Sequence, residues 1–143
     1  MANRLACDLS ERIAAIGSVS GAYRWSEACS PTRPVSILGM HDTDDTVIPY
    51  NGYQDGNLPP MVYGMVDTPI PQWASAWGTR NGCDDEPSRA DQNALVTKEE
   101  WSHCRADASV ILYTIHGGGH GWTQAIDAAQ VIWNFFAEHP LVK

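Results

Sequence analysis

The residue best suited to chemistry in this chain is His120, which follows a run of three glycines. The glycines come shortly after the apolar segment Val110–Ile115, whose β-branched and aromatic residues favour a buried strand. Because ligands of open α/β sheets bind at the carboxyl ends of the strands, His120 is placed for proton transfer near neutral pH. The alternative is an ordinary histidine that forms hydrogen bonds in a glycine-rich loop.

An acidic turn at residues 42–45 is the second candidate, and it follows a second apolar segment, 35–40. Three carboxylates in this spacing resemble the start of a calcium loop, but the glycine and the distal glutamate that such a loop needs are absent. A sharper interpretation is that one aspartate, at the end of a parallel strand, orients an imidazole from another strand end. Solvated loop carboxylates are the alternative.

A serine hydroxyl is the third group that the chemistry would need, and Ser20 is the candidate nucleophile. It ends the short apolar run 13–21, and Ser18 shares its face but lies deeper in the expected strand. The segment 17–21 looks like a nucleophile elbow, but it has Val19 where Gly-x-Ser-x-Gly has serine. No such motif occurs in the chain. A small residue at a strand end, without chemistry, is the alternative for Ser20.

The elements that must position these residues alternate between helical and strand patterns. The pattern predicts helix 2–9, strand 13–20, strand 35–40, helix 72–80, strand 110–115 and helix 125–139. Between them we expect a long irregular loop at 53–71, a polar loop at 84–93 and a short helical turn beginning at the capping box 97–100. This order predicts an α/β domain with a short, mainly parallel sheet flanked by helices.

Composition limits the possible partners. The 143 residues fit one domain, 1–143, and 43% of them are hydrophobic. A formal net charge of −8 and the lack of a basic run argue against nucleic acid and against an anionic membrane surface. No apolar stretch approaches the roughly 20 residues that cross a bilayer, and the first residues lack the apolar core of a signal peptide.

Four cysteines occur at positions 7, 29, 83 and 104. Without a Cys-x-x-Cys pair, a zinc or thioredoxin-type site is disfavoured, and two disulfides are the better interpretation. Sequential pairing would close two short loops, but four cysteines allow three connectivities, and reduced buried thiols remain an alternative. Disulfides would indicate export, with which the missing signal peptide conflicts.

Four segments together resemble one family. Segment 41–50 is similar to His-Gly-Thr-x-Asp-x-x-Val-Pro-Tyr, and 117–124 is similar to Gly-Gly-Gly-His-x-Trp-Pro-Gly. Segment 77–83 is similar to Trp-Ala-x-x-Asn-Gly-Cys, and 1–7 resembles the helix that follows a nucleophile elbow. Over nearly its whole length the chain thus resembles the C-terminal half of the polyhydroxybutyrate depolymerase and feruloyl esterase family of secreted α/β-hydrolases.

This resemblance implies a truncated α/β-hydrolase fold and a serine-type carboxylic-ester hydrolase acting on a small-molecule ester without a cofactor or metal. It gives Asp45 the role of the acid and His120 that of the base, and it supports a Cys83–Cys104 disulfide. It also implies a secreted or periplasmic location. Asp42 replaces a glycine of the family pattern, and Thr123-Gln124 replaces Pro-Gly.

The family's nucleophilic serine would lie before Met1, so Ser20 or a partner chain would have to supply the hydroxyl. Truncation would also leave strand 13–20 at an unprotected sheet edge, which predicts a homodimer through this strand or through helix 2–9. A catalytically inactive binding or assembly module is the alternative function. A weaker alternative is a metal site built from the set His41, Asp45, His116 and His120.

Overall fold

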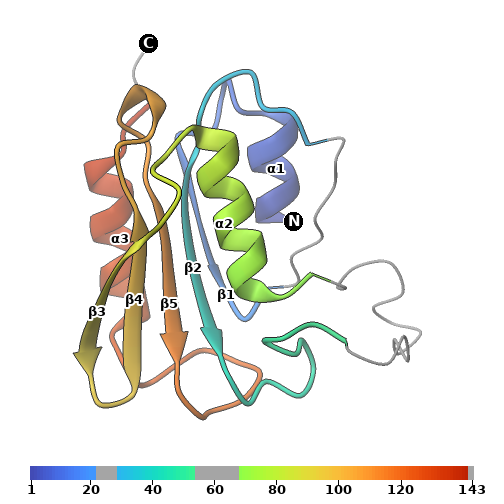
Figure 1. Cartoon of the computed structure of the whole chain (residues 1–143), viewed down its shortest axis with the longest axis vertical. Helices are drawn as coiled ribbons and strands as arrows, with labels where there is room; N and C mark the ends of the chain where they lie inside the picture. The colour runs from blue at the N-terminus through green and yellow to red at the C-terminus, as the bar shows by residue number, and fades with distance from the viewer. Residues whose placement is uncertain (22–28, 54–67, 142–143) are drawn as a thin grey trace.

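A mixed five-stranded sheet forms the centre of the chain in a computed structural model that describes residues 1–21, 29–53 and 68–141 (Figure 1). The elements, in chain order, are α1 (Ala2–Asp8), β1 (Ala15–Val19), β2 (Ser36–Asp42), α2 (Ile70–Asn81), β3 (Ser88–Asn93), β4 (Val96–Trp101), the short 3₁₀ turn η2 (Arg105–Asp107), β5 (Val110–Ile115) and α3 (Ala128–Glu138). Within the described ranges the helices predicted at 2–9, 72–80 and 125–139 and the strands predicted at 13–20, 35–40 and 110–115 are therefore present, although β1 is only partly buried. Most of the long loop expected at 53–71 lies outside the described residues.

The strands are arranged in the order β1-β2-β5-β4-β3. β1, β2 and β5 run parallel, whereas β4 is antiparallel to β5 and β3 is antiparallel to β4. The prediction of a mainly parallel sheet is thus corrected to a mixed one. Its parallel part has the two buried strands β2 and β5 in adjacent positions, which brings their carboxyl ends together.

The β3–β4 hairpin corrects two predictions, a polar loop at 84–93 and a helical turn at 97–100. Every residue of β3 is exposed, and its sequence has no alternation of apolar and polar residues that would predict a strand. It forms a strand because it pairs with β4. The presumed capping residue Thr97 donates its hydroxyl proton to Asp91 Oδ1 across the hairpin at 2.9 Å. Thr97 therefore takes part in the hairpin and does not cap a helix.

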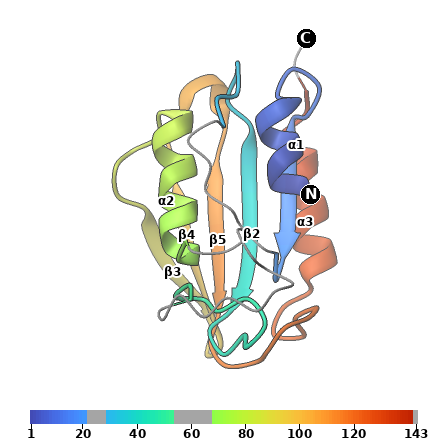
Figure 2. The ribbon, with the colours of Figure 1, turned by 90° about the vertical axis from the view of Figure 1, so that its right-hand side faces the viewer.

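Side chains on the two faces of the sheet form two apolar layers. Ile37 and Leu112 point to the face covered by α1 and α2, where Trp73 and Trp77 are buried. The alternate residues of the same strands point to the face covered by α3 (Figure 2). Because β2 and β5 are buried on both faces, their run of apolar residues is nearly continuous, as expected for central parallel strands.

Two disulfides join Cys7 to Cys29 and Cys83 to Cys104. The sequential connectivity is the one present, and the alternative of reduced thiols is wrong. Each bridge closes a loop beside one flanking helix, since Cys7 belongs to α1 and Cys83 follows the end of α2. None of the described helices has the length and apolar character needed to cross a membrane.

Candidate active site

The site lies where β2 and β5 end, because Asp42 and Ile115 are direct neighbours across these two parallel strands. Backbone and side-chain hydrogen bonds hold together the two loops that leave this point. Thr43 N donates to Ile115 O at 2.8 Å, and Gly117 N donates to Thr43 Oγ1 at 2.9 Å. The acidic turn and the glycine loop therefore begin side by side.

Asp45 and His120 meet across these two loops, with 3.0 Å between Asp45 Oδ2 and His120 Nδ1. The Asp45 side chain is 0% exposed and that of His120 is 41% exposed. Since an ionised carboxylate can only accept hydrogen bonds, His120 Nδ1 is the protonated nitrogen, and Nε2 is left as the basic one. The arrangement is a buried carboxylate that bonds to a partly exposed imidazole.

The Asp45 carboxylate is fixed by its own turn. Its Oδ1 accepts hydrogen bonds from Val47 N and Ile48 N, both at 2.8 Å. This is the local pattern that favours aspartate in turns, because the side chain satisfies backbone N–H groups that follow it. One carboxylate oxygen therefore shapes the turn, and the other faces the imidazole.

His41 lies beside the Asp45 carboxylate and contacts the same turn. Its Nε2 donates to Ile48 O at 2.8 Å and lies 3.4 Å from Asp45 Oδ2. Burial lowers the pKa of His41 below 6.5, although the Ile48 carbonyl and Asp45 act in the opposite direction and His120 adds a small lowering effect. At neutral pH His41 is therefore uncharged and acts as a hydrogen-bond donor within the turn.

Ser20 follows β1 and is buried, with a positive φ of 47°. Its Oγ donates to Gly121 O at 2.8 Å and accepts from Gly121 N at 3.3 Å. The structure therefore brings Ser20 to the residue next to His120, while its single hydroxyl proton is directed to a backbone carbonyl. Ser18 lies two residues earlier, within β1.

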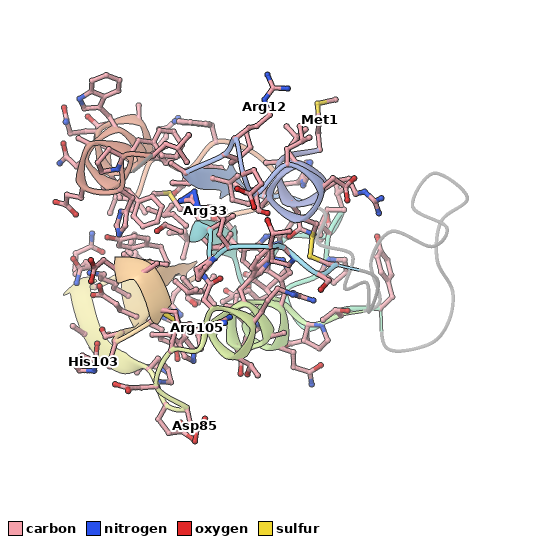
Figure 3. All side chains as sticks on the ribbon, turned by 90° about the horizontal axis from the view of Figure 1, so that it is seen from above. Met1, Arg12, Arg33, Asp85, His103 and Arg105 are labelled. Carbon is pink, nitrogen blue, oxygen red and sulfur yellow. A yellow bond between two sulfur atoms is a disulfide. The ribbon has the colours of Figure 1, made fainter. Side chains whose placement is uncertain are left out.

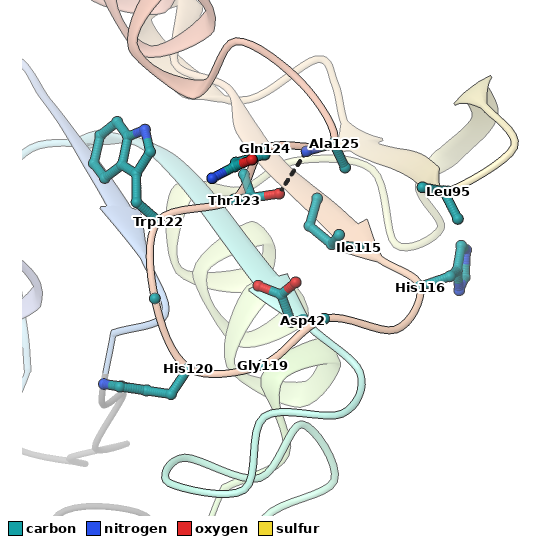
Figure 4. Close-up of a pocket in the computed structure, with 12 residues that line it drawn as sticks. Asp42, Leu95, Ile115, His116, Gly119, His120, Trp122, Thr123, Gln124 and Ala125 are labelled. Atoms are coloured by element: carbon teal, nitrogen blue, oxygen red, sulfur yellow. Dashed lines mark hydrogen bonds between the residues drawn. The ribbon is translucent and has the colours of Figure 1, made fainter.

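The glycine loop also encloses a pocket of about 530 Å³ on its inner side (Figure 4). The wall includes Asp42, Leu95, Ile115 and His116, and the loop residues Gly118–Ala125 complete it. The β3–β4 hairpin supplies one side, because His116 N donates to Leu95 O at 2.8 Å. In Figure 4 the His120 imidazole points away from the Asp42 carboxylate, while His120 remains one of the residues that line the pocket.

The metal alternative is not supported. Across the described ranges, no group of three or more His, Cys, Asp or Glu side chains is arranged to hold a metal ion. His116 instead forms a 2.8 Å hydrogen bond through Nε2 with Thr97 Oγ1. Because that hydroxyl already donates to Asp91, His116 Nε2 must be the donor in this contact.

Three features of the site were not predicted from the sequence: the Thr43 link between the loops, the support of Asp45 by His41, and the exposed indole of Trp122 at the pocket rim. Thr43 and His41 belong to segment 41–50, which resembles the family's acid motif. The motif could therefore have indicated that they lie near the site, but not which contacts they form. For Trp122 the residue type is known from the sequence, but only the fold shows that 62% of it is exposed.

Comparison with known proteins gives two relatives. The chain is 30% identical over 150 residues to "Feruloyl esterase B" of Piromyces equi, a match that covers 99% of the chain and 26% of that protein. It is 26% identical over 133 residues to "Putative esterase NocK" of Nocardia uniformis subsp. tsuyamanensis, covering 85% of the chain and 39% of that protein.

The chain thus spans about a quarter of the first relative and about two fifths of the second. No family model matches it. Together with the α/β architecture, the two matches relate the chain to proteins that are named as esterases.

Proposed function

We propose that this chain is a carboxylic-ester hydrolase of the serine type, in which His120 is the general base and Asp45 orients it. The observation that supports this most directly is the 3.0 Å contact between the buried Asp45 carboxylate and His120 Nδ1, which leaves Nε2 basic and accessible. The esterase names of both relatives agree with this chemistry. The relation also supports placing the chain as one part of an α/β-hydrolase fold.

The reaction follows from the protonation states. A serine hydroxyl transfers its proton to His120 Nε2 while its oxygen attacks the ester carbonyl, and Asp45 stabilises the resulting imidazolium. The tetrahedral intermediate collapses, and the leaving alcohol takes the proton from Nε2. Water then repeats the sequence on the acyl-enzyme, releasing the carboxylic acid and restoring the serine.

Ser20 is our candidate for this hydroxyl within the chain. It lies beside the His120 loop through its two hydrogen bonds with Gly121. To act as the nucleophile, its Oγ must leave the Gly121 carbonyl and donate to His120 Nε2 instead. A serine supplied by a partner chain is the second source that we propose.

A homodimer through β1 would provide such a partner. β1 is an outermost strand of the sheet, so the N–H and C=O groups on its outer side have no neighbouring strand within the described part of the chain. An isologous pair would place the Ser20 ends of the two strands in one interface. The two disulfides further support a secreted or periplasmic location, where such bridges persist.

Hydrolysis of 4-nitrophenyl acetate tests the proposed function. We expect His120→Ala to abolish turnover and Asp45→Asn to lower it by about 10²–10⁴-fold. The chain offers a matched control in His103, which is exposed at the periphery of the molecule (Figure 3) and forms a 2.7 Å contact with Asp84 away from the site. His103→Ala should leave the rate unchanged, and equal losses from both histidine variants would assign the activity to surface groups.

Ser20 is tested separately by Ser20→Ala and by a serine-reactive phosphonate followed by peptide mass mapping. Label on Ser20 that is lost in His120→Ala supports the internal nucleophile. Label on another serine, with activity that depends on protein concentration, supports the partner-supplied hydroxyl.

A non-catalytic binding or assembly module is the second candidate function. The observation that favours it is the Ser20 proton directed at Gly121 O, in a chain without Gly-x-Ser-x-Gly. For this candidate, wild-type protein should hydrolyse the ester no faster than His120→Ala does, and the phosphonate should label no serine.

A further inference from the structure

Asp42 is the only acidic side chain among the described residues that line the 530 Å³ pocket. It is 4% exposed, and Figure 4 shows its carboxylate pointing into the space enclosed by the loop. No described residue donates a hydrogen bond to this carboxylate. Because the carboxylate faces the pocket, its hydrogen bonds must come from water or from a ligand bound there.

The charge around the pocket favours a cation for this purpose. No lysine or arginine is found among the described lining residues. Burial raises the pKa of Asp42, and the negative charges of Asp45 and Asp44 raise it further. A positively charged donor relieves all three effects at once, whereas a neutral hydroxyl supplies only a hydrogen bond.

The walls of the pocket suit an apolar body attached to that cation. Leu95, Ile115 and Ala125 contribute aliphatic surface, whereas Figure 4 shows the exposed Trp122 indole projecting away from Asp42 and Ile115. The volume lies within the range of about 300–1,000 Å³ that is usual for small-molecule sites.

We infer that this pocket is a binding site for a small organic cation, whose ammonium group bonds to the Asp42 carboxylate while its apolar body packs against Leu95 and Ile115. The ligand would be held by Asp42, whereas the proposed ester chemistry uses Asp45 and His120; His120 also lines the pocket. The proposed cation site depends on Asp42, which replaces a glycine of the family's acid motif.

Titration of the full chain with benzylammonium at neutral pH, followed by calorimetry and by the amide NMR signals of Gly118 and Gly119, tests this site. Benzyl alcohol is the neutral probe of similar shape. We expect saturable binding of benzylammonium and binding of benzyl alcohol that is weaker by about tenfold or more. The shifted signals should be those of the loop.

Two variants distinguish the contribution of Asp42 to cation binding from that of the overall negative charge. Asp42→Asn should weaken benzylammonium binding to the level of benzyl alcohol. Asp44→Asn removes the same charge from an exposed position of the same turn that does not line the pocket, and should leave binding within about threefold. Benzyl alcohol binding as tightly as benzylammonium, no saturation by either probe, or an equal effect of the two variants would overturn the inference. The probe comparison needs only wild-type protein, so it decides the matter even if Asp42→Asn does not fold.

Discussion

The α-carbon of Gly118 packs directly against the Asp42 carboxylate, so closely that a Cβ at position 118 would overlap Asp42 Oδ1. Gly118 also has a φ of +73°, which other residues rarely adopt. This contact couples the acidic turn to the loop that holds His120. Substitutions at Gly117 and Gly119 allow the effect of backbone strain to be separated from that of steric overlap with Asp42.

Gly118→Ala should lower the free energy of unfolding by about 2–4 kcal/mol, since it combines backbone strain with steric overlap. Gly117→Ala has the same backbone problem, with a φ of +83°, but meets no atom within 4 Å, so it should cost only about 1–2 kcal/mol. Gly119→Ala should change little. Urea unfolding of the three variants measures the series.

A second substitution at Asp42 checks the cause of that loss. In the Asp42→Gly background, Gly118→Ala should cost no more than Gly117→Ala, because the overlapping carboxylate is gone. An unchanged cost in that background would mean that strain alone explains the effect.

Asp45 should matter for stability as well as for the proposed ester chemistry. Asp45→Ala leaves the N–H groups of Val47 and Ile48 without their acceptor, and we expect a loss of about 1–3 kcal/mol. Asp45→Asn keeps an acceptor oxygen and should cost less. Thermal unfolding of both variants, with the exposed Asp44→Ala as control, measures the difference; equal melting temperatures for Asp45→Ala and Asp44→Ala would contradict the role of the turn.

His41 makes stability depend on pH. Its folded-state pKa lies below 6.5, so between these two values the unfolded chain binds a proton that the folded chain excludes. The free energy of unfolding should therefore be highest above pH 6.5 and fall as the pH drops below it. Asp42 has the opposite sign at lower pH, because its pKa is raised from 3.8.

His41→Gln keeps a donor for Ile48 O and removes the titration, so it should flatten the loss of stability below pH 6.5. His103, whose pKa is raised by the exposed Asp84, contributes to the pH dependence above pH 6.5 instead, so His103→Gln is the control and should retain the wild-type loss of stability below pH 6.5. Denaturant unfolding across the pH series makes the comparison, and a wild-type slope in His41→Gln would remove His41 as its cause.

The two disulfides should differ in how readily they are reduced. Cys7 and Cys29 are buried, whereas Cys83 and Cys104 are partly exposed. A mild thiol reductant should therefore open Cys83–Cys104 first, as seen by mass mapping after alkylation. Each bridge spans 21 or 22 positions, so replacing either pair by serine should cost about 3 kcal/mol.

The sequence predicts β5 closely because Val110–Ile115 is apolar throughout and is followed by glycine. It fails at β3, where Ser88–Asn93 has no buried residue, and at Thr97, whose side chain serves the hairpin. The proximity of Asp45 and His120 followed from the rule that parallel strand ends share one edge, together with the motif resemblance. Contacts such as Thr43 with Gly117 depend on the register between strands, which local pattern does not specify.

The turn of the β3–β4 hairpin can change in sequence or length without altering the central strands. The antiparallel pairing brings this turn to the same end of the sheet as the glycine loop, where Leu95 O accepts from His116 N and Asn93 Nδ2 donates to Ala125 O at 3.1 Å. Turns between paired strands tolerate insertions and replacements well. A longer or altered turn would reshape one wall of the pocket while β2 and β5 kept Asp45 and His120 in place. Ligand preference and acid–base geometry are therefore separately adjustable in this fold.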